Sequence, residues 1–140
     1  MFQLKGIPAA SGISIARAYK IGKEEFIVPK EKITPQQIPL QIQLFEEALI
    51  QTRRQIIELQ KKIAQEMGQE QAEIFDAHLL VLEDRMLIEE VIARIKKELL
   101  NVAFIFSEVL KKYIEVFSKI EDEYLRERIA DINDVGKRVL

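Results

Sequence analysis

The sequence predicts a mainly α-helical protein in which antiparallel helical hairpins form a bundle. After Pro39, the last of four prolines, only Gly68 and Gly136 interrupt a run of good helix formers. Apolar residues in this run recur at helical spacing, and the polar stretches between them are short. Helices joined by short turns pack as antiparallel neighbours, which favours hairpins in a bundle.

The first 28 residues have a different pattern. They contain three of the five glycines, Gly6, Gly12 and Gly22. Their apolar residues alternate with the period of a strand, at Ile13, Ile15, Tyr19 and Ile21. We therefore expect a short N-terminal β segment over residues 1–28, whose apolar side chains pair as a hairpin, pack on the bundle or meet another chain.

The first helix is expected to begin near Thr34. The order Thr34-Pro35-Gln36-Gln37 provides an N-cap, a proline at the first helical position and a glutamine three residues after the cap. A 3.5-residue repeat then predicts a long helix that lies along another helix and ends at Gly68. Its seam contains one polar residue, Thr52, among apolar ones: Ile38, Ile42, Phe45, Leu49, Ile56, Leu59 and Ile63.

Three more helices follow from the same kind of spacing. A shorter helix starts near Asp84, with Ile88, Val91, Ile92, Ile95 and Leu99 on its apolar face. Asn101 is the expected N-cap of the next, which carries Ala103, Phe106, Val109 or Leu110, Tyr113, Phe117 and Ile120. The last carries Tyr124 or Leu125, Ile129, Ile132, Gly136 and Val139.

Residues 66–90 combine acidity with an excess of apolar side chains. They hold eight carboxylates against a single basic residue, Arg85. Between Gln69 and Leu82 the apolar residues divide into two stripes, a core stripe of Ala72, Phe75, Leu79 and Leu82 and a second stripe of Ile74, His78 and Val81. Leu80 and Leu87 are near enough to extend the second stripe. We interpret it as a docking surface for another protein; the alternative is that both stripes are buried between two hairpins.

Composition excludes several classes of function. With 21 basic and 23 acidic residues and no basic run longer than two, nucleic acid is not expected as a partner. Cysteine is absent, and no apolar stretch is long enough to span a membrane or serve as a leader. We therefore expect a cytoplasmic protein with one main core and a small appendage.

Catalytic constellations are missing from the sequence. His78 is the only histidine, so a paired-histidine metal site cannot form. Phosphate-binding glycine loops and nucleophile turns are also absent. These patterns leave His78 as a phosphoacceptor, a contact residue or a plain surface residue.

Three blocks of sequence resemble one family. Residues 6–13 (GIPAASGI), 72–84 (AEIFDAHLLVLED) and 122–138 (DEYLRERIADINDVGKR) look like the N-terminal region of Enzyme I, the phosphoenolpyruvate-protein phosphotransferase of the bacterial sugar phosphotransferase system. The resemblance implies that residues 1–28 belong to an incomplete phosphohistidine domain. It implies that residues 29–140 form a helical domain that binds the phosphocarrier protein HPr.

The resemblance also assigns a partner-binding surface. Carried over by position, it comprises Ile74, His78, Leu80, Val81, Asp84, Leu87, Phe117, Leu125 and Arg128. Gln69, Gln71 and Arg85 depart from the charges common in the family. The family's phosphorylated histidine lies in a Gly-Gly-x-x-Ser-His-type motif that these residues lack, so His78 is expected to contact the carrier.

By resemblance the parent is a transferase, and this chain alone is expected to be inactive. No cofactor is expected here, because the family binds magnesium outside this region. The full-length family dimerises through a region that is likewise absent. Two other classes stay open: a structural helical-hairpin dimerisation module, and an enzyme active as it stands.

Overall fold

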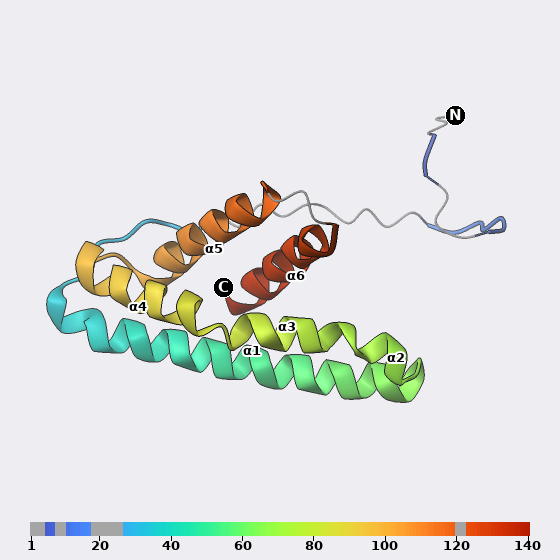
Figure 1. The fold of residues 1–140 in the computed structure, drawn as a ribbon, viewed down its shortest axis with the longest axis horizontal. Helices are drawn as coiled ribbons and strands as arrows, with labels where there is room; N and C mark the ends of the chain where they lie inside the picture. The colour runs from blue at the N-terminus through green and yellow to red at the C-terminus, as the bar shows by residue number, and fades with distance from the viewer. Residues whose placement is uncertain (1–4, 8–10, 18–26, 120–122) are drawn as a thin grey trace.

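The computed structural model describes residues 5–7, 11–17, 27–119 and 123–140, without the side chains of residues 123–128. The described chain is mainly helical, which confirms the predicted class (Figure 1). A 3₁₀ turn precedes six helices: η1 (Pro35–Gln37), α1 (Ile38–Glu66), α2 (Gln69–Ala72), α3 (Ile74–Leu82), α4 (Arg85–Glu98), α5 (Val102–Ser118) and α6 (Glu123–Val139).

The long helix α1 forms one side of the bundle (Figure 1). Helices α2, α3 and α4 run back along it in the opposite direction. Helices α5 and α6 pack against each other, α4 also packs against α5, and α6 also packs against α3. The helix α6 therefore contacts three neighbours, α1, α3 and α5, and its inward face is enclosed.

The helix α1 follows its predicted seam. Phe45, Thr52 and Ile56 are its buried residues. The Thr52 hydroxyl donates to the carbonyl oxygen of Arg138 in the last turn of α6, at 3.4 Å. Gly68 follows the helix with φ 111°, a conformation that L side chains rarely adopt, so a glycine is needed where the chain reverses into α2.

The helix α4 begins where the sequence predicted, immediately after Asp84. The Asp84 carboxylate accepts a hydrogen bond from the Leu87 backbone N–H at 3.0 Å, which satisfies one of the free donors of the first turn. At the other end, Leu99 adopts the left-handed conformation with φ 53° and closes the helix without a glycine. Its carbonyl oxygen accepts from the Ile33 backbone N–H at 2.9 Å.

Asn101 occupies the N-cap position of α5, but its side chain does not cap the helix. Its Oδ1 accepts from the Glu31 N–H at 3.0 Å and its Nδ2 donates to the Pro29 carbonyl at 3.2 Å. The Val102 N–H donates instead to Gln41 Oε1 at 2.7 Å. Asn101 therefore attaches the chain before α1 to the α4–α5 junction.

Most buried side chains form one large cluster. It contains Phe45, Leu87, Val91, Ile95, Leu100, Ile105, Phe106, Val109, Leu110 and Ile132. A smaller cluster of Ile56, Leu82 and Val135 joins α1, α3 and α6. Gly136 lies beside the larger cluster, where a Cβ atom would overlap Leu110 Cδ1 and come within 3.3 Å of Leu110 Cδ2. Glycine thus permits the close approach of α5 and α6.

The predicted β segment is not confirmed. No named strand occurs among the described residues, and the isolated antiparallel bridge between Lys32 and Leu100 lies after residue 28. Ile13 and Ile15 are almost fully exposed, so they do not pack on the bundle. A strand needs a partner for its backbone groups, and the described residues supply none there. Tyr19 and Ile21 lie outside the described residues.

Within the parts of the chain that are described, no helix has both the length and the apolar character needed to cross a bilayer.

Candidate functional site

The two stripes expected on residues 69–82 differ in burial. In the core stripe, Ala72 and Leu82 are buried, and Phe75 and Leu79 pack against the smaller cluster, as predicted. Of the second stripe only Ile74 is exposed, at 56%, whereas His78 and Val81 are partly buried. Leu80, which was expected to extend that stripe, is 61% exposed. The helix α3 therefore buries one face and keeps large apolar side chains at the surface on another.

His78 lies between these two extremes. Its side chain is only 14% exposed, and its Nε2 atom lies 3.1 Å from Asp131 Oδ1 on α6. The ring of Phe75 meets the imidazole edge-on, with centroids 5.5 Å apart. His78 is therefore not a plain surface residue. Asp131 was not anticipated as its partner, because 53 positions separate the two residues and no local pattern links them.

Five of the predicted partner-binding residues converge on one hollow of about 230 Å³, which we call the Leu80–Phe117 groove. The residues that line it come from α3, α5, α6 and the start of α4: Leu80, Val81, Asp84, Leu87, Tyr113, Phe117 and Ile132. Ile74 and His78 do not line it. Leu125 and Arg128 belong to the part of α6 whose side chains are not described. Tyr113 and Ile132 were expected only as core positions, although their helical spacing places them beside Phe117.

One expectation needs correction. Leu87 does not extend an outward stripe, since it is 4% exposed and belongs to the large core cluster. The cause is the break between α3 and α4, where Asp84 caps a new helix and the helical phase restarts. Val81 is half-buried and packs against both core clusters. Among the apolar residues that line the groove, Leu80 is therefore exposed and Leu87 is buried.

Polar groups border the groove at Asp84 and Tyr113. Burial is the largest cause that raises the pKa of Tyr113 above its ordinary value of 10, and the negative charges of Asp84 and Glu90 raise it further. The phenol is therefore protonated at neutral pH and can donate a hydrogen bond. Asp84 is exposed and supplies a negative charge at the same place.

Ion pairs in the folded chain offset part of the negative charge of residues 66–90. Within the described side chains, three of the eight carboxylates form ion pairs: Glu83 with Arg53 at 3.1 Å, Glu89 with Arg85 at 2.8 Å and Glu90 with Lys112 at 2.7 Å. Two of the basic partners come from other helices, α1 and α5. Counting charges within residues 66–90 does not include these two basic residues, because they are distant in the sequence. The net negative charge of residues 66–90 at the surface is therefore smaller than their eight carboxylates suggest.

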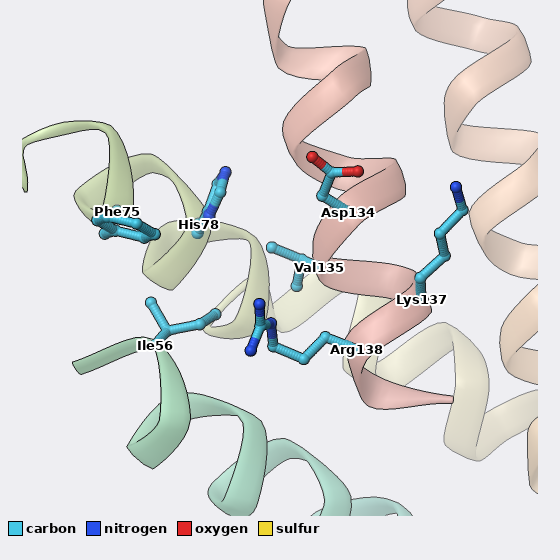
Figure 2. A pocket seen from close by; sticks show the side chains of 7 residues that line it. All are labelled: Ile56, Phe75, His78, Asp134, Val135, Lys137 and Arg138. Carbon is cyan, nitrogen blue, oxygen red and sulfur yellow. The ribbon is translucent and has the colours of Figure 1, made fainter. Parts of the chain in front are cut away.

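A second hollow, of about 360 Å³, lies between α1, α3 and α6 (Figure 2). We call it the Arg138 pocket. The residues that line it are Ile56, Phe75, His78, Asp134, Val135, Lys137 and Arg138. The helices α3 and α6 contribute to both hollows.

Metal ligands do not gather at either hollow. No group of three or more histidine, aspartate or glutamate side chains converges among the described residues. We therefore assign no metal-binding role to these side chains.

The fold and its groove define the class of protein as an α-helical domain with an open, largely apolar groove between its helices. The chain belongs to the family described as "PEP-utilising enzyme, N-terminal", whose family model matches residues 5–128. The resemblance to the N-terminal region of Enzyme I is thereby confirmed.

Curated relatives carry the name phosphoenolpyruvate-protein phosphotransferase, a transferase. The protein from Bacillus subtilis (strain 168) is 36% identical over 139 residues, which are 99% of this chain and 24% of the relative. The protein from Staphylococcus carnosus (strain TM300) is 37% identical over 138 residues, with the same shares. The chain thus spans about a quarter of the length of the curated relatives it matches.

A solved structure agrees with these relatives. A solution NMR structure of Enzyme I superimposes with a TM-score of 0.76 at 37% sequence identity. The match covers 83% of this chain and 47% of that one.

Proposed function

We propose that this chain provides the surface on which a phosphoenolpyruvate-protein phosphotransferase holds the phosphocarrier protein HPr, during phosphate transfer from phosphoenolpyruvate for sugar uptake. Family membership supports the enzyme class. The convergence of Leu80, Val81, Asp84, Leu87 and Phe117 on one groove is the observation that carries the docking proposal.

The groove has the composition of the centre of a protein interface. Exposed Leu80 and half-buried Phe117 offer apolar surface that a partner can desolvate, and one well-buried aliphatic side chain contributes on the order of 1.5–3 kcal/mol. The protonated Tyr113 hydroxyl offers a donor beside them. Carriers of this kind present a basic, partly apolar face, to which the Asp84 carboxylate is complementary.

His78 serves in this proposal as a residue that shapes the surface. A phosphoacceptor nitrogen must be open to attack, whereas Nε2 of His78 faces Asp131 and the ring is mostly buried. The phosphorylated histidine of the parent enzyme would lie outside the residues of this chain. The chain then docks the carrier and takes no part in the chemistry.

Leu80→Asp tests the docking proposal. Leu80 projects into the groove with most of its surface exposed, so the change introduces a desolvation penalty at the interface with little effect on the core. We expect HPr binding, measured by isothermal titration calorimetry, to weaken by at least about tenfold, which corresponds to about 1.4 kcal/mol. Val81 is a poorer choice because it packs against both core clusters.

Ile50→Asp is the matched control. Ile50 is an exposed apolar residue on α1 and does not line the groove, so this variant should bind HPr as the parent chain does. Circular dichroism at 222 nm should be the same for all three proteins. Equal HPr affinity for Leu80→Asp and the parent would place the site elsewhere. Self-association of the parent that Leu80→Asp abolishes, without any HPr binding, would instead support a dimerisation module.

A further inference from the structure

The Arg138 pocket has an apolar floor and a cation at its mouth, a combination that the docking groove lacks. We propose that it binds a small organic anion, in which a carboxylate is attached to a compact apolar body such as a phenyl ring. The inference does not depend on HPr docking, because the pocket is formed by other side chains than the Leu80–Phe117 groove.

The floor of the pocket comes from three helices. Ile56 of α1 and Val135 of α6 form the base of the floor, where they are 1% and 2% exposed and meet in the smaller core cluster. Phe75 of α3 packs against the same cluster and presents its ring toward the hollow (Figure 2). Because Phe75 is only half-buried, a phenyl or branched aliphatic group would bury apolar surface chiefly against its ring.

The cation is the guanidinium of Arg138. Its side chain extends from the last turn of α6 toward the space between Ile56 and His78 (Figure 2). None of the ion pairs found among the described side chains includes Arg138. The Thr52 hydroxyl bonds to its backbone carbonyl and so anchors the turn from which the guanidinium projects. A guanidinium binds a carboxylate through two parallel hydrogen bonds, which makes it a specific receptor for this group.

The two remaining charged residues that line the pocket, Asp134 and Lys137, carry opposite charges. In the view of Figure 2 both of these side chains extend upward from α6, away from Ile56. The nearby carboxylate of Asp131 is already engaged by His78. Arg138 is therefore the charge that an occupant of the floor would meet first.

Three ligands, benzoate, benzyl alcohol and acetate, separate the contribution of the apolar contact from that of the carboxylate bound to Arg138. Each is titrated into the uniformly ¹⁵N-labelled 140-residue chain, and amide shifts of α3 and α6 are followed by NMR. For so small a ligand we expect benzoate to saturate with a Kd of about 1–10 mM. Benzyl alcohol lacks the charge and acetate lacks the ring, so each should bind at least about fivefold more weakly.

Two variants assign the binding to the pocket. Arg138→Gln should weaken benzoate by about fivefold and change benzyl alcohol by less than about twofold. Arg54→Gln removes an exposed arginine of α1 that does not line the pocket, and should leave all three ligands unaffected. Thermal unfolding of both variants shows whether the fold is retained. Benzoate binding that Arg138→Gln does not change, equal affinity for benzyl alcohol, or no saturable shift for any ligand would each overturn the proposal.

Discussion

Gly136→Ala tests how closely α5 and α6 pack. Gly136 is buried on α6, and an added methyl group would overlap Leu110 Cδ1 while lying 3.3 Å from Cδ2 and 3.4 Å from Cγ. Leu110 is itself buried in the large core cluster, so it cannot swing into solvent to make room. The new methyl must displace packed neighbours or separate the two helices.

Two opposing terms decide the size of the effect. Alanine is favoured over glycine inside a helix by about 1 kcal/mol. Overpacking a core costs about 1–3 kcal/mol, and the overlap with a buried side chain places this site near the upper value. We therefore expect the free energy of unfolding to fall by about 2 kcal/mol, the difference between the two terms.

Urea unfolding followed by circular dichroism at 222 nm measures this change. Leu110→Ala provides the companion variant, because it removes the atoms that the new methyl would overlap. Alone it should cost about 2–5 kcal/mol through the cavity it leaves. In that background, Gly136→Ala should become neutral or stabilising, which gives a large coupling free energy in the double-mutant cycle. A Gly136→Ala chain as stable as the parent would refute the reasoning.

Two further predictions concern the groove and His78. The pKa of Tyr113 is higher in the folded chain than its ordinary value of 10, so its contribution to stability is present below that value and is lost as the pH rises through the folded pKa. Tyr113→Phe should therefore lose less stability than the parent between neutral pH and pH values above 10, as measured by urea unfolding at each pH; an identical decline would contradict this. Incubating the chain with labelled phosphoenolpyruvate and magnesium should leave His78 unlabelled, with the full-length Bacillus subtilis relative as the positive control; label on His78 by mass spectrometry would exclude a purely docking role.

The helices could be predicted from sequence because their signals are local. The seam of α1, the reversal at Gly68 and the start of α4 near Asp84 each depend on residues within a few positions of one another. The structure of the N-terminal segment could not be predicted in the same way. The alternation of Ile13 and Ile15 indicates a preference for a strand but not the presence of a second strand to pair with it. Asn101 shows the same limit, because its side chain bonds to Pro29 and Glu31 instead of capping α5.

The candidate site could be predicted only in part. Resemblance to a family placed Leu80, Val81, Asp84 and Phe117 together, and the structure brings them to one groove. The burial of Leu87 follows from the spacing of α4 itself, since Leu87 lies four residues before Val91 and eight before Ile95 on the buried face. Extending the helical phase of α3 across the break at Asp84 obscured this. The pairing of His78 with Asp131 and the neutralisation of Glu83 and Glu90 depend on which helices become neighbours.

Thr52 has a consequence for the alignment of the helices. An entirely apolar contact between α1 and α6 would lose little buried area if one helix shifted along the other by a turn. Such a shift would leave the buried hydroxyl of Thr52 without the Arg138 carbonyl, at a cost typical of an unsatisfied polar group. One hydroxyl in the middle of a long seam thus favours the observed axial alignment of α1 and α6, and with it the position of Arg138 beside the Arg138 pocket.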